Sequence, residues 1–102
     1  MNFVRAEIDT FYGDFPALFE FDIDSNTGEI KGKYSFIGYT GDFSGSKVGE
    51  DGYTVSGIVD SYIGPIEFTI RGSVDHLHII GNGVTDKHGT FTIRGTLDAE
   101  IL

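Results

Sequence analysis

The chain has 102 residues, the size of one domain with a single core. It contains no cysteine, which excludes disulfides, thiolate metal sites and thiol nucleophiles. Sixteen acidic residues against seven basic ones give a formal net charge of −9, which repels phosphate backbones and anionic lipid surfaces. We therefore expect neither a nucleic acid nor a membrane as partner. Neither a signal peptide nor a membrane-spanning helix is recognisable, so we expect a soluble, cytoplasmic protein.

Apolar residues recur at every second position along most of the chain, and no segment has a helical pattern. Turn residues divide the chain at 13–14, 25–28, 37–40, 50–52, 64–65, 75–76 and 87–89. Strands are expected over 2–12, 15–24, 29–36, 41–48, 53–63, 66–74, 77–85 and 90–101. The fold class is therefore all-β, with about eight short strands in one domain over residues 1–102.

Glycines recur near the middle of several expected strands. Residues 68–75 return almost unchanged as 91–98, each with a central glycine. The glycine series is Gly32, Gly45, Gly57, Gly72, Gly81 and Gly95. Glycine on a concave face permits the sharp coiling that a small barrel requires, so we expect a closed up-and-down antiparallel barrel. A two-sheet sandwich is the alternative.

Hairpin length decides which residues face each other, and the turns above predict a register. The predicted cross-strand pairs are Ile8 with Phe19, Arg5 with Asp22, Asp22 with Lys31, Glu20 with Lys33, Gly32 with Gly45, and Gly57 with Gly72. With this parity, one face is apolar and is expected to be the interior. It holds Val4, Ala6, Ile8, Phe19, Phe21, Ile23, Ile30, Tyr34, Phe36, Phe43, Val55, Val59, Phe68, Ile70, Val74, Leu77, Ile79, Phe91, Ile93 and Leu97. Most charged and hydroxyl side chains fall on the other face.

Two histidines offer a weak candidate for a metal site. His76 and His78 are at positions i and i+2, which share one face of a strand, and a hairpin at 86–89 would bring Asp98 and Glu100 beside them. The predicted parity points both histidines to solvent, whereas a catalytic metal normally needs a shaped, partly dry cavity. We therefore expect no metal and no other cofactor.

The segment at residues 39–45, YTGDFSG, resembles the Gly-Thr-Gly-x-Phe-x-Gly stretch of dirigent proteins, a family that shares an eight-stranded barrel with allene oxide cyclases. The resemblance implies a barrel. It is confined to this segment, and it places no functional residue of that family on the chain.

The first functional hypothesis is non-catalytic binding of a small apolar molecule inside the barrel. The expected binding residues are Tyr12, Tyr34, Tyr53, Phe36, Phe43 and Phe68. Eight strands enclose a space that side chains just fill or that holds one small ligand, and ordinary packing density favours a filled interior.

Three alternatives remain open. The first is a structural or protein-interaction module, which includes a homo-oligomer. Several large apolar side chains favour it, because strand alternation directs them to the outer face. They are Phe3, Phe11, Leu18, Ile58, Tyr62, Ile80 and Val84. The second is an engineered barrel without a natural ligand, since short turns and the lack of Cys and Trp are typical of such chains. The third is a barrel isomerase or cyclase, which needs an inward titratable group, and the predicted register offers only Tyr and Thr side chains and Lys47.

Overall fold

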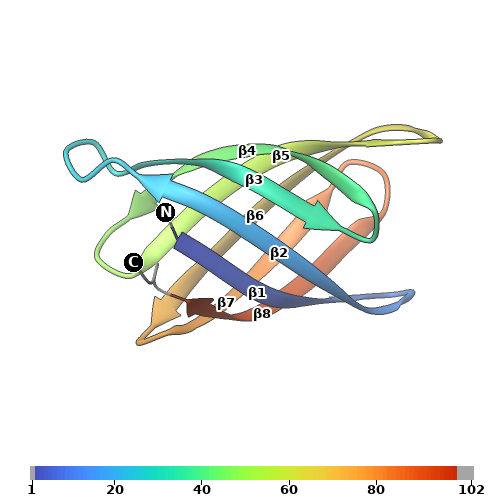
Figure 1. Cartoon of the computed structure of the whole chain (residues 1–102). Helices are drawn as coiled ribbons and strands as arrows, with labels where there is room; N and C mark the ends of the chain where they lie inside the picture. Colours follow the sequence, from blue (N-terminus) through green and yellow to red (C-terminus); the bar gives the residue numbers. More distant parts are fainter. Residues whose placement is uncertain (1, 99–102) are drawn as a thin grey trace.

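The computed structural model describes residues 2–98 and shows eight antiparallel strands closed into a barrel (Figure 1). The strands are β1 (Asn2–Thr10), β2 (Gly13–Ile23), β3 (Glu29–Phe36), β4 (Tyr39–Val48), β5 (Gly52–Ser61), β6 (Gly64–Asp75), β7 (His78–Thr85) and β8 (Gly89–Asp98). Each strand pairs with the next in the chain, and β8 pairs with β1. The predicted all-β, up-and-down closed barrel is confirmed, and the sandwich alternative is not what forms. Within residues 2–98, no helix has the length and apolar character needed to cross a membrane.

The register agrees with the prediction in one hairpin and differs in the others that we predicted. Asp22 lies opposite Lys31 and Glu20 opposite Lys33 in the β2–β3 pair, as expected. The other predicted pairs are wrong. The structure pairs Ile8 with Phe15, Arg5 with Leu18, Gly32 with Phe43, and Gly57 with Phe68.

Glycines that follow the turns explain the largest of these shifts. We expected the β5–β6 turn at Gly64-Pro65, but its two central residues are Tyr62 and Ile63, and Ser61 pairs with Gly64. Gly64 has a positive φ of 111°, which glycine adopts without steric cost, and it directly follows the turn. The Ser61 hydroxyl donates a hydrogen bond to the carbonyl oxygen of Gly64 at 2.7 Å. Moving a turn back by two residues shifts the register by four.

The β1–β2 hairpin has the same construction. Thr10 pairs with Gly13, which has a φ of 123°, and the Thr10 hydroxyl donates to the Gly13 carbonyl oxygen at 2.9 Å. The expected turn at Gly13-Asp14 therefore lies at residues 11–12.

The predicted division into an inner and an outer face is nevertheless confirmed. Each register error is an even number of residues, and an even shift leaves every side chain on its face. The buried core consists of Val4, Ile8, Ala17, Phe19, Ile30, Tyr34, Phe43, Val55, Phe68, Ile70, Ile79 and Ile93. Ala17 was not on the predicted list. Ile23 and Leu77 were expected inside, but they are 40% and 53% exposed because they lie where the barrel opens at one end.

Inward-facing glycines lie directly beneath large side chains of neighbouring strands. Gly41 pairs with Tyr34, and a Cβ placed on Gly41 would come within 2.9 Å of the Tyr34 ring. Gly32 lies between Phe21 and Phe43, its partners on β2 and β4. The glycines make room for these rings inside a narrow barrel.

Candidate functional site

Packed side chains in the middle of the barrel divide its interior into two cavities, one at each end. The Phe19 and Ile70 side chains line both cavities and are 8% and 2% exposed. Aromatic pairs tighten this layer, since Phe19 meets Phe43 edge to face with ring centroids 5.5 Å apart, and Tyr34 meets Phe68 at 5.6 Å. The interior is thus filled in the middle and hollow at both ends.

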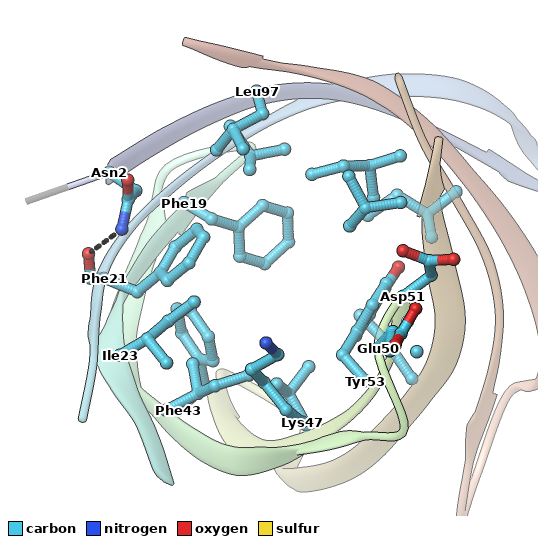
Figure 2. Close-up of a pocket in the computed structure, with 18 of the residues that line it drawn as sticks. Asn2, Phe19, Phe21, Ile23, Phe43, Lys47, Glu50, Asp51, Tyr53 and Leu97 are labelled. Atoms are coloured by element: carbon cyan, nitrogen blue, oxygen red, sulfur yellow. Dashed lines mark hydrogen bonds between the residues drawn. The ribbon is translucent and has the colours of Figure 1, made fainter. Parts of the chain in front are cut away.

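The first cavity, which we call the Lys47 cavity, opens at the end of the barrel where β1 begins and β8 ends (Figures 1 and 2). Its volume is about 290 Å³. Its wall is almost entirely apolar and rests on core residues of the strands. Its polar lining residues are Asn2, Lys47, Glu50, Asp51, Tyr53 and His76.

Strand alternation places Lys47 on the inner face. Phe43 and Gly45 precede it at every second position of β4, and all three face the interior. The Lys47 amide N–H donates to the carbonyl oxygen of Gly28 at 2.9 Å, which ties the end of β4 to the β2–β3 turn. Figure 2 shows the Lys47 side chain directed into the opening. No carboxylate within residues 2–98 forms an ion pair with its ammonium group.

The β4–β5 turn contributes the acidic side of this mouth. Glu50 and Asp51 lie beside Tyr53 in Figure 2, and the Asp51 carbonyl oxygen accepts a hydrogen bond from the Val74 amide at 2.8 Å. The Tyr53 hydroxyl donates to the carbonyl oxygen of Ile80 at 3.1 Å. Burial raises the pKa of Tyr53 to about 12, so this phenol stays neutral at physiological pH.

The second cavity, which we call the hairpin-tip cavity, lies at the opposite end and has a volume of about 480 Å³. Strand residues form most of its lining, and the hairpin turns add Tyr12, Ile37, Tyr62, Ile63 and His88. Of these, Tyr12 is 72% and Tyr62 93% exposed. Deeper inside, the Tyr34 hydroxyl donates to the carbonyl oxygen of Ile58 at 2.7 Å. Burial, and after it the charges of Asp60 and Asp42, raise the pKa of Tyr34.

The six predicted ligand-binding residues are divided between these cavities. Four of them line the hairpin-tip cavity: Tyr12, Tyr34, Phe36 and Phe68. The other two, Phe43 and Tyr53, line the Lys47 cavity. The hydroxyl hydrogens of Tyr34 and Tyr53 are donated to backbone carbonyl oxygens, so each hydroxyl oxygen can only accept a hydrogen bond from a ligand.

The histidine metal site is not assembled by the described residues. His76 lies in the β6–β7 turn with a φ of 55° and borders the Lys47 cavity, while His78 is exposed at the start of β7. The predicted pairing of His78 with Asp98 is wrong, because His78 faces Thr96. Asp98 instead pairs with Arg5 at 3.1 Å. Glu100 lies outside the described residues.

The structure brings together an acidic cluster that sequence reasoning missed. Carboxylate oxygens of Glu7, Asp9 and Asp14 lie within 4.8 Å of one another on the outside of β1 and β2. Arg94 on β8 binds Glu7 at 2.9 Å and Asp9 at 3.2 Å. The three carboxylates meet in the β1–β2 hairpin, where Asp9 pairs with Asp14, whereas Arg94 joins them only because β8 closes on β1. We assign it a structural role.

Outward apolar side chains on the barrel wall are separated by polar neighbours. Leu18 lies between Arg5 and Ser35 on the adjacent strands, and Val84 lies between Thr69 and Thr90. At the hairpin-tip end, by contrast, exposed apolar residues gather around one opening: Tyr12, Ile37, Tyr62 and Ile63.

No family model, no curated protein and no solved structure matches this chain.

Proposed function

We propose that this protein binds a small, mostly apolar molecule non-catalytically in the Lys47 cavity. The observation that carries the proposal is a hollow of about 290 Å³ with an apolar wall and polar groups gathered at its mouth. Small-molecule sites are typically concave and mostly apolar, with a few placed polar groups, and they measure roughly 300 to 1,000 Å³. This cavity is close to the lower limit, which favours a ligand of modest size.

The origin of its wall residues favours this cavity over the larger one. Its wall is built mainly from strand residues, which neighbouring strands hold on both sides, such as Val55 and Ile79. The hairpin-tip cavity takes part of its apolar wall from turn residues such as Tyr62, which is 93% exposed. A preorganised wall loses less conformational entropy when a ligand binds.

A matched pair of filling substitutions tests the proposal. Val74 lines only the Lys47 cavity, Val59 lines only the hairpin-tip cavity, and both are half-buried on the inner face. Val74→Phe places a ring in the first cavity, and Val59→Phe places the same ring in the second. Nile red, a neutral hydrophobic fluorophore, serves as the probe, and native mass spectrometry of the purified protein reports any ligand carried from the host.

We expect Nile red to bind the wild-type protein with a blue-shifted emission. Val74→Phe should weaken this binding about tenfold or more, since a filled cavity no longer removes the probe from water. Val59→Phe should leave it within about twofold of the wild-type value. Circular dichroism and urea unfolding confirm that both variants fold. Absence of binding to the folded wild-type protein, or weakening by Val59→Phe alone, would overturn the proposal.

A further inference from the structure

We infer that the ligand of the Lys47 cavity is an amphipathic monocarboxylic acid whose carboxylate binds the Lys47 ammonium group while its apolar part lies in the cavity. The inference rests on the proposed function and specifies the chemistry of its ligand.

Lys47 is the exception on the inner face. Within residues 2–98, it is the only charged side chain at an inward-facing position of a strand, where the other positions carry apolar residues, glycine, hydroxyl groups or, at Asn2, an amide. The deeper inward positions of β4 are Phe43 and Gly45, and Lys47 follows them at the exposed mouth of the cavity. A ligand carboxylate at this mouth would accept a charge-assisted hydrogen bond from the ammonium group.

The acidic side chains near Lys47 do not form an ion pair with its ammonium group. The chain carries sixteen acidic residues, and Glu50 and Asp51 follow Lys47 closely in the sequence, yet no ion pair joins any described carboxylate to Lys47. In Figure 2, Glu50 and Asp51 lie beside Tyr53, while the Lys47 side chain turns toward the middle of the opening. The ammonium group is therefore available to an occupant of the cavity.

The same mouth limits the charge that a ligand can carry. One ammonium group balances one carboxylate, whereas Glu50 and Asp51 repel additional negative charge. A phosphate monoester would carry close to two charges and meet this repulsion. The apolar wall, which includes Phe19, Phe21 and Ile23, suits a hydrocarbon body rather than a sugar. A monocarboxylic acid with a short hydrocarbon chain satisfies both conditions.

The test compares an acid with its uncharged ester in displacement of Nile red. Decanoic acid and methyl decanoate share the hydrocarbon chain and differ in charge. They are titrated into the wild-type protein, Lys47→Met and the matched control Lys31→Met. Lys31 also lies on a strand, but its side chain is 72% exposed outside the barrel, where it contacts Glu29 at 3.5 Å. Methionine keeps an unbranched chain of similar length and removes the charge.

We expect the wild-type protein and Lys31→Met to prefer decanoate over the ester by about fivefold, the factor that one ion pair of about 1 kcal/mol supplies. Lys47→Met should lose this preference and retain its affinity for Nile red and for the ester. Equal displacement by acid and ester in the wild-type protein, or a preference that survives in Lys47→Met, would overturn the inference. Failure of the proposed function gives a different result, because Nile red would then not bind, or its binding would be weakened by Val59→Phe alone.

A second arm probes the charge of the head group. The double substitution Glu50→Gln with Asp51→Asn removes two negative charges from the mouth, so the affinity for decanoate should rise while that for the ester stays unchanged. Phenyl phosphate should compete with Nile red less well than benzoate. Unchanged decanoate affinity in the double variant, or stronger competition by the phosphate, would contradict a monocarboxylate at Lys47.

Discussion

Tyr53 on β5 lies over Gly72, its cross-strand partner on β6, and its hydroxyl reaches across to donate to the carbonyl oxygen of Ile80 on β7 at 3.1 Å. A Cβ on Gly72 would lie 2.6 Å from that hydroxyl and would overlap the Ile80 carbonyl oxygen. The absence of a side chain at Gly72 thus leaves the space that the Tyr53 hydroxyl needs to reach the Ile80 carbonyl oxygen. The mid-strand glycines of this chain make room for side chains, in addition to permitting the strands to bend.

Gly72→Ala should lower the free energy of unfolding by about 2 kcal/mol or more, the upper part of the range for overpacking, because the clash involves backbone atoms that cannot move aside. Urea unfolding measures the change. Ser73→Ala, at the next and outward position of β6, is the control and should have little effect. Equal stability of Gly72→Ala and the wild-type protein would show that β6 tolerates a methyl group there.

Tyr53→Phe should make the barrel less sensitive to alkaline pH. Burial raises the pKa of Tyr53 from 10.0 to about 12 in the folded protein, so the folded state holds this proton more tightly than the unfolded chain. The resulting stability is fully present below pH 10 and is lost as the pH rises toward 12. Urea unfolding at a series of alkaline pH values should therefore show a shallower decline for Tyr53→Phe. Tyr62→Phe, at a 93% exposed position, should follow the wild-type curve. Parallel curves for all three proteins would contradict the assigned burial.

Asp14→Asn should stabilise the barrel at neutral pH. Asp14 faces Asp9 across β1 and β2, and a hydrogen bond between the two carboxyl groups raises the pKa of Asp14 and lowers that of Asp9. The Asp9 Oδ1 atom is buried without a donor in the described residues, and a proton on Asp14 would supply one. Asparagine offers its amide N–H at any pH.

The sign of the effect with pH follows from the raised pKa of Asp14. Its favourable contribution is present below the unfolded value of 3.8 and is lost as the pH rises through the folded pKa. The advantage of Asp14→Asn should therefore shrink on acidification, which thermal unfolding across the acidic range measures. Asp60→Asn serves as a control for the general loss of one negative charge. A variant that is less stable than wild type at neutral pH would show that the Asp14 charge is favourable.

Gly89→Ala should cost about 1 to 2 kcal/mol, although space is free at this position. Gly89 has a φ of 79°, and no atom lies within 4 Å of a Cβ placed there, so the cost comes from the backbone alone. Gly89→Asn should cost less, because asparagine adopts a positive φ more readily than alanine. Urea unfolding of the two variants gives the comparison, and an alanine variant as stable as the asparagine variant would contradict this explanation.

Sequence reasoning located the inner face but not the cross-strand partners. Ile8 and Phe19 were predicted as neighbours and are both buried, yet Ile8 lies opposite Phe15. The predicted interior is nevertheless right, because every register shift is an even number of residues, which leaves each side chain on its face. The displacement itself came from Gly13 and Gly64, which follow their turns instead of forming the centres, and a sequence does not distinguish these two roles of glycine.

The candidate site was predictable only in part. The inward position of Lys47 could be inferred from the sequence, because side chains alternate between the two faces of a strand. The acidic mouth at Glu50 and Asp51 could have been suspected from a turn that directly follows that strand. The division of the predicted aromatic residues between two cavities could not be predicted from the sequence. It depends on which rings meet across the middle of the barrel, such as Phe19 with Phe43.

The sequence by itself determined that this protein is a single all-β barrel with an apolar inside and a charged outside, because alternation is a local property of an extended chain that each strand carries independently. Only the tertiary structure decided the register, the two cavities and the neighbours of Arg94, since these depend on the backbone of each turn and on the closure of β8 against β1. Closure couples all eight strands at once. A cavity is the space that their side chains jointly leave open, and no single segment of the sequence encodes it.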